Sequence, residues 1–318
     1  MNNSILVTGG AGFVGSALLR ELQSQCPSDT QITVVDDFSF GREEFLPTDA
    51  RIAVSKLDIR DRKSVLACIE QIKPDVVYHL AAMHFIPACN KDPDKCLEVN
   101  VIGTQNILDA LRLLPPKTVV AISSAAVYPI FDSKCSEDKL APGPTDIYGL
   151  SKLTNEMQVR QFAAETPSKC SAVRLFNVIG PRETNPHVLP AIIEQLLRGD
   201  SVLKLGNVEP KRDYIDSRDV ATAFVSIANR TADGFRTYNV GSGQEYSVRE
   251  LVGMLSEIVG RSLTIESDPS RVRASDRMHL LSDIAQIHQD TGWSPAFGIR
   301  ESLKSLWDWY NARGKAIG

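Results

Sequence analysis

Three glycines spaced three residues apart constrain the fold of this chain more than any other feature of its sequence. Gly9, Gly12 and Gly15 lie directly between a strand-like stretch and a helical pattern. Glycines in this arrangement allow a tight turn, close approach of the backbone to a pyrophosphate, and close packing of helix on strand. The helix that begins there also offers free amides and a favourable dipole to phosphate groups. The turn therefore predicts a dinucleotide site at the start of an α/β sheet.

The rest of the first half alternates short apolar runs with helical patterns, as a parallel sheet requires. The predicted strands, which read as buried on both faces, are Ile5–Thr8, Ile32–Asp36, Val76–Leu80, Thr118–Ser123 and Ala172–Asn177. The predicted helices are Gly15–Ser24, Arg62–Ile72, Leu97–Leu114 and Tyr148–Glu165. Right-handed crossovers would bring the carboxyl ends of the strands to one edge, where we expect the ligand.

The chain changes character after about residue 178, where prolines interrupt a loop before a helical pattern at Ala191–Arg198. Later strands are predicted at Lys211–Asp216, Thr237–Val240 and Leu263–Glu266, helices at Asp219–Ala228 and Val248–Val259, then a basic loop at Arg271–Arg277 and two late helical segments. We expect a doubly wound, Rossmann-type domain over residues 1–177, to which segments near 211–243 return. Residues 178–318 should form mainly a smaller α/β substrate lobe, interleaved with it.

Composition narrows the class of protein. The 318 residues are 43% hydrophobic and 23% charged, with a formal net charge of −4, as in ordinary globular proteins. This charge gives no reason to expect nucleic acid or an anionic membrane as partner, and no apolar run reaches the roughly 20 residues that span a bilayer. The six cysteines and five histidines are scattered, which argues for reduced thiols and against a metal site. The start of the chain leaves no room for a signal peptide, so we expect a cytoplasmic protein.

The second predicted strand ends in a pair of carboxylates, Asp36 and Asp37. They follow the glycine turn at the place where an acidic side chain binds the adenosine ribose of a dinucleotide. No arginine immediately follows to bind a 2′-phosphate, the nearest being Arg42, and this favours NAD over NADP. Asp58 could border the adenine or could cap the helix that follows it, and both roles are compatible.

A tyrosine and a lysine four residues apart, Tyr148 and Lys152, share one face of a predicted helix. A tyrosine has a pKa of about 10, and a nearby positive charge lowers it by stabilising the phenolate. A tyrosine of this kind could take a proton from a sugar hydroxyl while a nicotinamide takes the hydride. The spacing alone is a weak signal, because it also occurs by chance on surface helices.

With these residues assembled, the chain resembles the extended short-chain dehydrogenases/reductases, in particular the NAD-dependent nucleotide-sugar epimerase/dehydratase family. The resemblance covers essentially the whole chain. It is carried by the glycine turn and by the segments His79–Ala82, Asn100–Thr104, Arg174–Arg182, Arg212–Ile215 and Arg273–Asp276.

Transferred residue by residue, the resemblance implies three groups of site residues. The catalytic group would be Ser124, Tyr148 and Lys152. NAD would be held by Gly9, Gly12, Phe13, Val14, Gly15, Asp36, Asp37, Asp58, Ile59, Leu80, Ala81, Ala82, Asn100, Tyr148 and Lys152. The nucleotide sugar would be bound by His84, Ser124, Asn177, Val188, Arg212, Arg273 and Asp276, with the arginines suited to its diphosphate. The roles of Arg271 and Arg277 stay undecided.

The residues after Ser124 bear on the reaction. Dehydratases of the family carry an Asp-Glu pair there and decarboxylases a Glu, whereas this chain has Ala125 and Ala126, which cannot move protons. We therefore expect an epimerase, most plausibly a UDP-sugar 4-epimerase that acts through a 4-keto sugar. A dehydratase or a 4-ketoreductase with the same oxidation machinery is the alternative, and a non-catalytic NAD-binding scaffold is a remote one. His84 is the residue best able to overturn this expectation, either as a substrate contact or as a packing group, and His187 is similarly open.

The resemblance also implies a homodimer. In the family, the helix after Asn100 and the helix that carries Tyr148 commonly pack into an intermolecular bundle. The sugar and the base of the nucleotide are not readable from any motif.

Overall fold

The computed structural model describes residues 4–230, 232–269 and 277–317, and Arg271, Arg273 and Asp276 therefore lie outside the described residues. Its central feature is a seven-stranded sheet in the order β10-β6-β5-β4-β1-β2-β3, in which every pairing is parallel. Its strands are β1 (Ser4–Thr8), β2 (Gln31–Asp36), β3 (Ile52–Lys56), β4 (Val76–His79), β5 (Thr118–Ser124), β6 (Lys169–Leu175) and β10 (Phe235–Val240). This is the predicted doubly wound sheet, and the fold class is confirmed.

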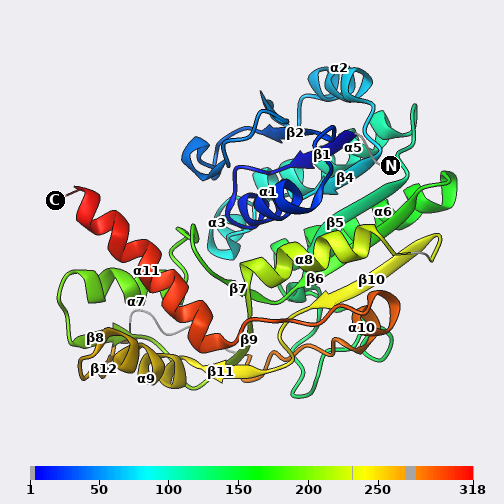
Figure 1. Ribbon diagram of the computed structural model, residues 1–318. Helices are drawn as coiled ribbons and strands as arrows, with labels where there is room; N and C mark the ends of the chain where they lie inside the picture. Colours follow the sequence, from blue (N-terminus) through cyan, green and yellow to red (C-terminus); the bar gives the residue numbers. More distant parts are fainter. Residues whose placement is uncertain (1–3, 231, 270–276, 318) are drawn as a thin grey trace.

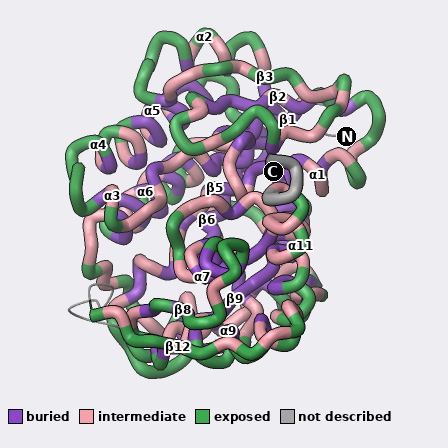
Figure 2. The backbone as a smooth tube through the Cα atoms, turned by 90° about the vertical axis from the view of Figure 1, so that its left-hand side faces the viewer, coloured by how far each residue is buried: buried purple, intermediate pink, exposed green. Residues whose placement is uncertain are grey.

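Helices cover both faces of this sheet (Figure 1). One apolar core joins the sheet to α1 (Phe13–Gln25), α8 (Ser217–Ala228) and α10 (Ala285–Thr291). A second core joins its other face to α2 (Arg62–Ile72), α5 (Gly103–Leu111) and α6 (Ile147–Glu165). Buried strands run between these partly exposed layers in Figure 2, which explains why the strand sequences are apolar on both faces.

The strand order reverses direction at β1, which pairs with β2 on one side and with β4 on the other. In doubly wound sheets, the crevice at this reversal, beyond the carboxyl ends of the strands, is the ligand site. The loops after β1, β2 and β4 therefore lie at the position where a dinucleotide binds.

The smaller lobe contains a three-stranded and a two-stranded sheet with an apolar core of its own. The first has β7 (Asn177–Ile179), β9 (Lys211–Asp216) and β11 (Glu245–Ser247), and the second β8 (Val202–Leu205) and β12 (Thr264–Ser267). They pack with α7 (Val188–Leu197), α9 (Val248–Val259) and α11 (Ile299–Ile317). The chain returns to the large sheet at β10 and not at β9. Helix α8, which comes before β10, packs against α1.

Two predicted elements differ in detail. The strand expected over Ala172–Asn177 is divided, because the chain leaves the large sheet after Leu175 and Asn177 begins β7 in the smaller one. The single helix expected over Leu97–Leu114 is also divided. Its parts are α4 (Pro93–Leu97), a π-helical turn η2 (Glu98–Ile102) and α5. The remaining short elements are η1 (Glu43–Phe45), α3 (Ile86–Lys91) and η3 (Ala125–Val127).

Candidate active site

The glycine turn is built so that only glycines fit at two of its positions. Gly9 follows β1 with a φ of 71°, and a Cβ there would lie 2.7 Å from the Ala81 backbone nitrogen. A Cβ on Gly15 would collide with the carbonyl oxygen of Gly9. Gly12 is the N-cap of α1 and provides no side chain to bond the first amides of the helix. These amides are therefore suited to a phosphate group.

Asp36 connects the glycine turn to the loop after β2. Its two carboxylate oxygens accept hydrogen bonds of 2.9 Å from the backbone amides of Ala11 and Phe38. Burial raises the pKa of Asp36 from its usual value, and these two bonds oppose the rise. Each oxygen keeps lone pairs for a further donor, such as a ribose hydroxyl. Asp37 accepts bonds from the amide and hydroxyl of Ser39.

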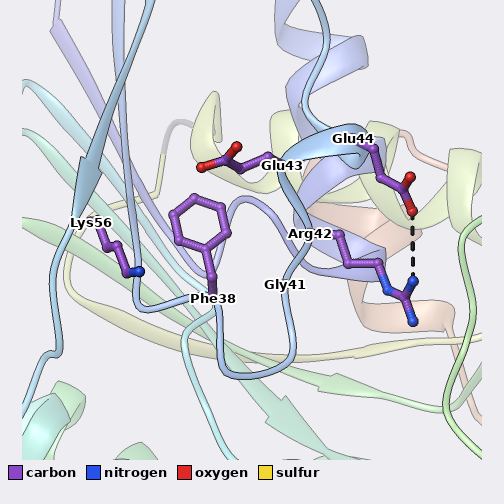
Figure 3. A pocket seen from close by; sticks show the side chains of 6 residues that line it. All are labelled: Phe38, Gly41, Arg42, Glu43, Glu44 and Lys56. Atoms are coloured by element: carbon purple, nitrogen blue, oxygen red, sulfur yellow. Dashed lines mark ion pairs between the residues drawn. The ribbon is translucent and has the colours of Figure 1, made fainter.

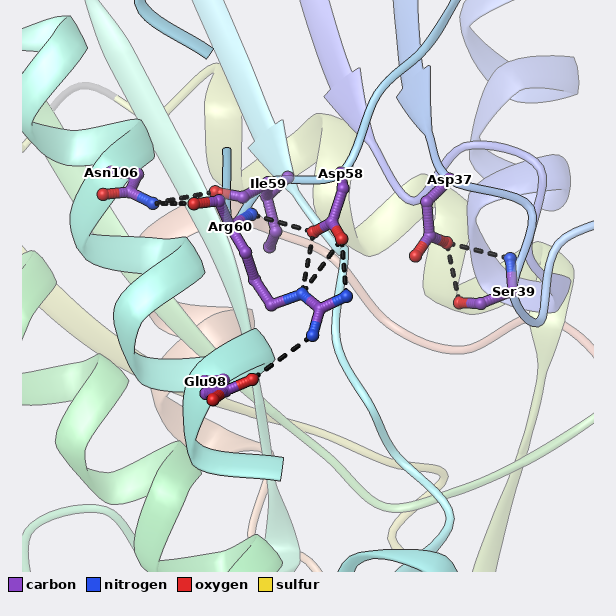
Figure 4. Close-up of polar contacts among 7 residues, drawn as sticks. All are labelled: Asp37, Ser39, Asp58, Ile59, Arg60, Glu98 and Asn106. Carbon is purple, nitrogen blue, oxygen red and sulfur yellow. Dashed lines mark hydrogen bonds and ion pairs between the residues drawn. The ribbon is translucent and has the colours of Figure 1, made fainter. Parts of the chain in front are cut away.

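A cavity of ≈ 210 Å³ extends from the glycine turn along the carboxyl ends of the strands, and Figure 4 shows some of the residues that line it. Its lining brings together residues predicted separately to hold the cofactor: Gly9, Asp36, Asp37, Asp58, Ile59, Leu80, Ala81 and Ala82. Phe13, Val14 and Gly15 lie at the start of α1 beside it. A pyrophosphate, a ribose and an aromatic base therefore each meet suitable chemistry here, and the residues fit NAD.

Arg42 does not line the cavity that contains Asp36. It lines an open hollow of ≈ 510 Å³ with Phe38, Glu43 and Lys56, and its guanidinium lies 3.7 Å from the carboxylate of Glu44 (Figure 3). This pairing agrees with the preference for NAD that the sequence predicts.

Asp58 is not the cap of α2, because Asp61 accepts the bonds from the Lys63 and Ser64 amides at that helix start. Asp58 instead pairs with Arg60, and the cap that sequence reasoning considered for Asp58 belongs to a residue three positions later. Its position in the cavity wall is compatible with the adenine role.

His79 and Asn100 are buried positioning groups. The ring nitrogens of His79 lie 2.7 Å from Thr8 Oγ1 and 2.8 Å from Thr104 Oγ1, and Thr104 in turn donates to the Asn100 carbonyl. The Asn100 amide donates to Ser151 Oγ and to the Met83 carbonyl, and its oxygen accepts the Met83 amide. Asn100 therefore fixes the loop after β4 against α6. The π-helical turn η2, which contains Asn100, makes this placement possible.

Two of the three predicted catalytic residues, Ser124 and Tyr148, meet at the end of β5, and Lys152 lies one turn further along α6. Ser124 ends this strand and Tyr148 lies in the first turn of α6, where its hydroxyl bonds to Ser124. A Cβ on Gly149 would collide with the carbonyl oxygen of Ala126, so this glycine lets α6 approach the loop after Ser124 closely. Asp146 caps α6 by accepting the Gly149 amide at 2.8 Å.

The electrostatics of this group are dominated by burial. Burial raises the pKa of the Tyr148 phenol above its usual range, and the Ser124 hydroxyl opposes the rise. Burial also lowers the pKa of Lys152 to about 8, and Lys152 Nζ donates to the Ile122 carbonyl at 3.2 Å. The protein by itself thus holds Tyr148 as a protonated phenol at neutral pH.

A buried ion pair behind the catalytic residues was missed by sequence reasoning. Glu156, one turn beyond Lys152, accepts bonds from Arg174 Nε and Nη2 at 2.8 and 2.7 Å, and from Ser123 Oγ at 2.6 Å. The Arg174 guanidinium also lies 4.7 Å from the ring centre of Tyr128. This pair ties α6 to β6 and to the residue that precedes Ser124. The segment Arg174–Arg182 was noticed only as a motif, and nothing local in it names Glu156 as the partner.

The predicted substrate residues come from several elements. Asn177 is exposed at the start of β7, and Val188 begins α7. Arg212 Nη1 on β9 donates to the carbonyl of Arg277, whose own guanidinium donates to the Tyr128 carbonyl. Arg277 therefore bridges β9 and the loop after Ser124.

His84 and His187 lie on one wall beside the catalytic group. Burial lowers the pKa of His84 to about 4, and the neighbouring His187 and Lys152 also lower it, so this ring is neutral at physiological pH. It packs edge-on against Phe40 with ring centres 5.6 Å apart. His187 Nδ1 lies 2.7 Å from Glu183 Oε1, and its ring lies 5.6 Å from that of Phe85. His187 is thus paired with a buried carboxylate, and His84 lies near it.

Among the described residues, no group of three or more His, Cys, Asp or Glu side chains could hold a metal ion. Over the same part of the chain, no helix is long and apolar enough to cross a membrane.

Known proteins can now be compared with this site. The sequence model of the NAD dependent epimerase/dehydratase family matches residues 5–241. The chain belongs to this family. The family uses NAD, which is the cofactor that the cavity fits.

Individual relatives cover most of the chain. It is 30% identical to the UDP-glucose 4-epimerase of Corynebacterium glutamicum over 98% of this chain and 96% of that protein. It is 33% identical to the GDP-6-deoxy-D-mannose reductase of Pseudomonas aeruginosa, over 74% of this chain and 80% of that one. Among solved structures, the UDP-glucose 4-epimerase of Thermotoga maritima with UDP-glucose has a TM-score of 0.88 at 26% identity, covering 99% of both chains.

Proposed function

We propose that this protein is an NAD-dependent nucleotide-sugar 4-epimerase that acts on a UDP-linked sugar. The observation that carries the proposal is that Tyr148, which meets Ser124, packs in one cluster with Met83 in the wall of the cavity suited to NAD, and that two alanines follow Ser124 in place of acid and base groups. Relatives named UDP-glucose 4-epimerase, matched over nearly the whole chain, support the UDP-sugar assignment.

Each residue of the site would have its own role in the reaction. Tyr148 accepts the proton of the sugar 4-hydroxyl and later returns it, while Ser124 donates a hydrogen bond to the same oxygen. Lys152, largely protonated at neutral pH, stabilises the phenolate form of Tyr148. NAD, held by the glycine turn and Asp36, would supply the hydride acceptor when bound. Arg212 and the start of α7 would bind the diphosphate.

The reason for epimerisation is the chemistry of the loop after Ser124. Ala125 is buried in η3 and Ala126 approaches Gly149, so neither position can take the proton from C5 or protonate the C6 hydroxyl as it leaves as water. A 4-keto sugar formed here finds no acid or base at these two positions, and we infer that it is reduced from the opposite face.

The test is incubation of the purified protein with UDP-glucose, UDP-galactose, their N-acetyl forms and UDP-glucuronic acid, followed by NMR of the products. We expect at least one pair of 4-epimers to interconvert without added cofactor turning over. A product that is only dehydrated or decarboxylated would contradict the proposal.

A 4-ketoreductase is the second candidate, since relatives include a GDP-6-deoxy-D-mannose reductase and a GDP-6-deoxy-D-talose 4-dehydrogenase. A reductase consumes external reduced cofactor in proportion to product, whereas an epimerase does not. Measuring absorbance at 340 nm during turnover separates these two functions.

We also propose that the protein is a homodimer built on η2 and α6. Ile102, Leu150 and Met157 leave 53%, 47% and 63% of their surfaces exposed, although large apolar side chains on a single-chain protein are more often buried. A second copy packed against this face would cover all three.

A further inference from the structure

The loop after β3, residues 57–61, is held from three sides. The Leu57 amide donates to the Asp36 carbonyl at 3.0 Å, which joins this loop to the ribose-side aspartate. Asn106 on α5 donates to the carbonyls of Ile59 and Arg60 at 3.0 and 3.1 Å (Figure 4). Gly103 leaves room for the loop, because a Cβ there would lie 2.6 Å from Ile59 Cδ1. The backbone that carries Asp58 is therefore rigid.

The side chain of Asp58 is also fixed, and the residue that fixes it is Arg60. Arg60 Nε and Nη2 donate to Asp58 Oδ2 at 2.9 and 2.6 Å, and the Arg60 amide donates to Oδ1 at 2.9 Å. On its far side, Arg60 Nη1 lies 3.3 Å from Glu98 Oε2. The guanidinium is thus clamped between two carboxylates that come from different elements (Figure 4).

This arrangement lies at one end of the cavity that fits NAD. Asp58, Ile59 and Arg60 line the same cavity as Asp36. Because the cavity continues from Asp36 to the loop after β3, the base of a dinucleotide whose ribose lies at Asp36 would lie along this loop. An adenine presents an exocyclic amino donor, and a carboxylate oxygen is its natural acceptor.

We propose that Arg60 is a positioning residue for the cofactor, which holds the Asp58 carboxylate in the orientation that accepts the 6-amino group of the adenine. Asp58 can rotate about two side-chain bonds, and the two-point contact with a planar guanidinium removes that freedom. Glu98 provides a second carboxylate on the far side of the Arg60 guanidinium. This inference rests on the NAD site of the proposed function and assigns Arg60 a role in selecting the base.

An exposed ion pair without this role would contribute little to stability, and it would not distinguish one base from another. The decisive comparison is therefore between two ligands that differ only at the 6-position. NAD carries the amino donor, and nicotinamide hypoxanthine dinucleotide carries an oxygen acceptor in its place.

The experiment measures the dissociation constants of both dinucleotides for the full-length protein, by fluorescence quenching, in the wild type, Arg60→Ala, Arg60→Lys and Asp58→Asn. We expect the wild type to prefer NAD by at least 10-fold. Arg60→Ala should reduce this preference to about 3-fold or less, mainly by weakening NAD, and Arg60→Lys should fall between the two. Arg62→Ala is the matched control, because Arg62 is two residues away, pairs with Asp109 and does not line the cavity.

Equal weakening of both dinucleotides in Arg60→Ala, or no change in their ratio, would overturn the proposal. Thermal melting curves check that each variant is folded, and the intermediate behaviour of Arg60→Lys guards against reading a folding defect as a loss of selectivity. Failure of the wild type to bind NAD at all would instead contradict the proposed function, so the two failures are distinguishable.

Discussion

At the scale of single residues, the proposed chemistry depends on Tyr148, and burial works against the form of Tyr148 that it requires. The phenol has its pKa raised by the surrounding apolar groups, and the Ser124 hydroxyl is the group of this chain that opposes the rise most. A tyrosine that is protonated in the empty site can act as a base only after substrate and cofactor have bound.

Tyr148→Phe removes the proton acceptor and keeps the ring that fills the pocket. We expect kcat to fall by about 10²–10⁴-fold, the usual contribution of a general base. NAD binding should change little. Turnover measured with the best substrate from the panel above, beside cofactor binding, checks this, and a variant with normal turnover would refute the mechanism.

Gly149 is the second residue with a sharp prediction. In Gly149→Ala, the new methyl group meets the Ala126 carbonyl, so α6 must move away from the loop that carries Ser124. We expect at least a 10-fold loss of kcat. The control is Gly253→Ala, since a Cβ there meets nothing within 4 Å and Gly253 lies inside α9. That change should stabilise the protein by up to about 1 kcal/mol. Equal effects of both alanines on kcat would contradict the steric argument.

His79 gives the protein a pH dependence. Burial lowers its pKa to about 3, while in the unfolded chain it is near 6.5. The unfolded state therefore takes up a proton as the pH falls through 6.5 and the folded state does not, so stability is lost toward acid. Between pH 7 and pH 5 this single group costs about 2 kcal/mol. His79→Gln should remove this part of the acid sensitivity, as measured by urea unfolding at both pH values; an unchanged difference would show that His79 titrates normally.

At the scale of elements, α6 is the helix that organises the site, and its position is set by contacts with β5, β6 and η2. It is capped by Asp146, approaches the Ser124 loop at Gly149, and is tied to β6 by the Glu156–Arg174 pair. Burial opposes the charge of Arg174, but its bonds to Glu156 raise its pKa above the usual value. The helix is therefore held by two polar anchors along its buried face.

Removing one partner of this pair should be far more harmful than removing both. Glu156→Gln leaves the buried Arg174 charge unbalanced, and we expect a loss of about 3–5 kcal/mol of unfolding free energy. The double change Glu156→Leu with Arg174→Met should recover much of this loss. Chemical denaturation of the three proteins measures it. A single variant as stable as the wild type would mean that the pair is solvated in solution.

At the scale of the whole molecule, the large sheet supplies the cofactor side and the smaller lobe supplies β7, β9 and α7 around the opposite side of the site. Arg277 joins these parts, since its carbonyl accepts from Arg212 while its guanidinium donates to Tyr128. The apolar face of η2 and α6 lies on the outer side of the helix that carries Tyr148. Assembly at this face would therefore buttress the catalytic helix.

The proposed dimer leads to a prediction about this face. Met157→Glu places a charge in the middle of it, and we expect the variant to sediment as a monomer of about half the wild-type mass. Leu197→Glu, on α7 in the smaller lobe, is the control and should leave the mass unchanged. A wild type that already sediments at 34.9 kDa would refute the dimer.

The amino-acid sequence by itself determined the sheet, the glycine turn and the catalytic spacing of Tyr148 and Lys152. These features depend on neighbours a few positions apart, so periodicity and local turn chemistry are enough to reveal them. The family followed from the same motifs in order. The boundaries of elements were less predictable. At Asn177 the chain leaves one sheet for another, and at Asn100 a π-helical turn interrupts an otherwise regular helical pattern.

Only the tertiary structure decided which charged groups face one another. Glu156 and Arg174 are 18 residues apart, Arg60 and Glu98 are 38 apart, and Arg212 meets a carbonyl 65 residues away. Many arginines and carboxylates in the sequence could have made such pairs, and no local pattern selects among them. The partner of each charged side chain is decided when the packed cores bring distant elements together. A buried charge must then pair with an opposite charge that the folded arrangement places beside it.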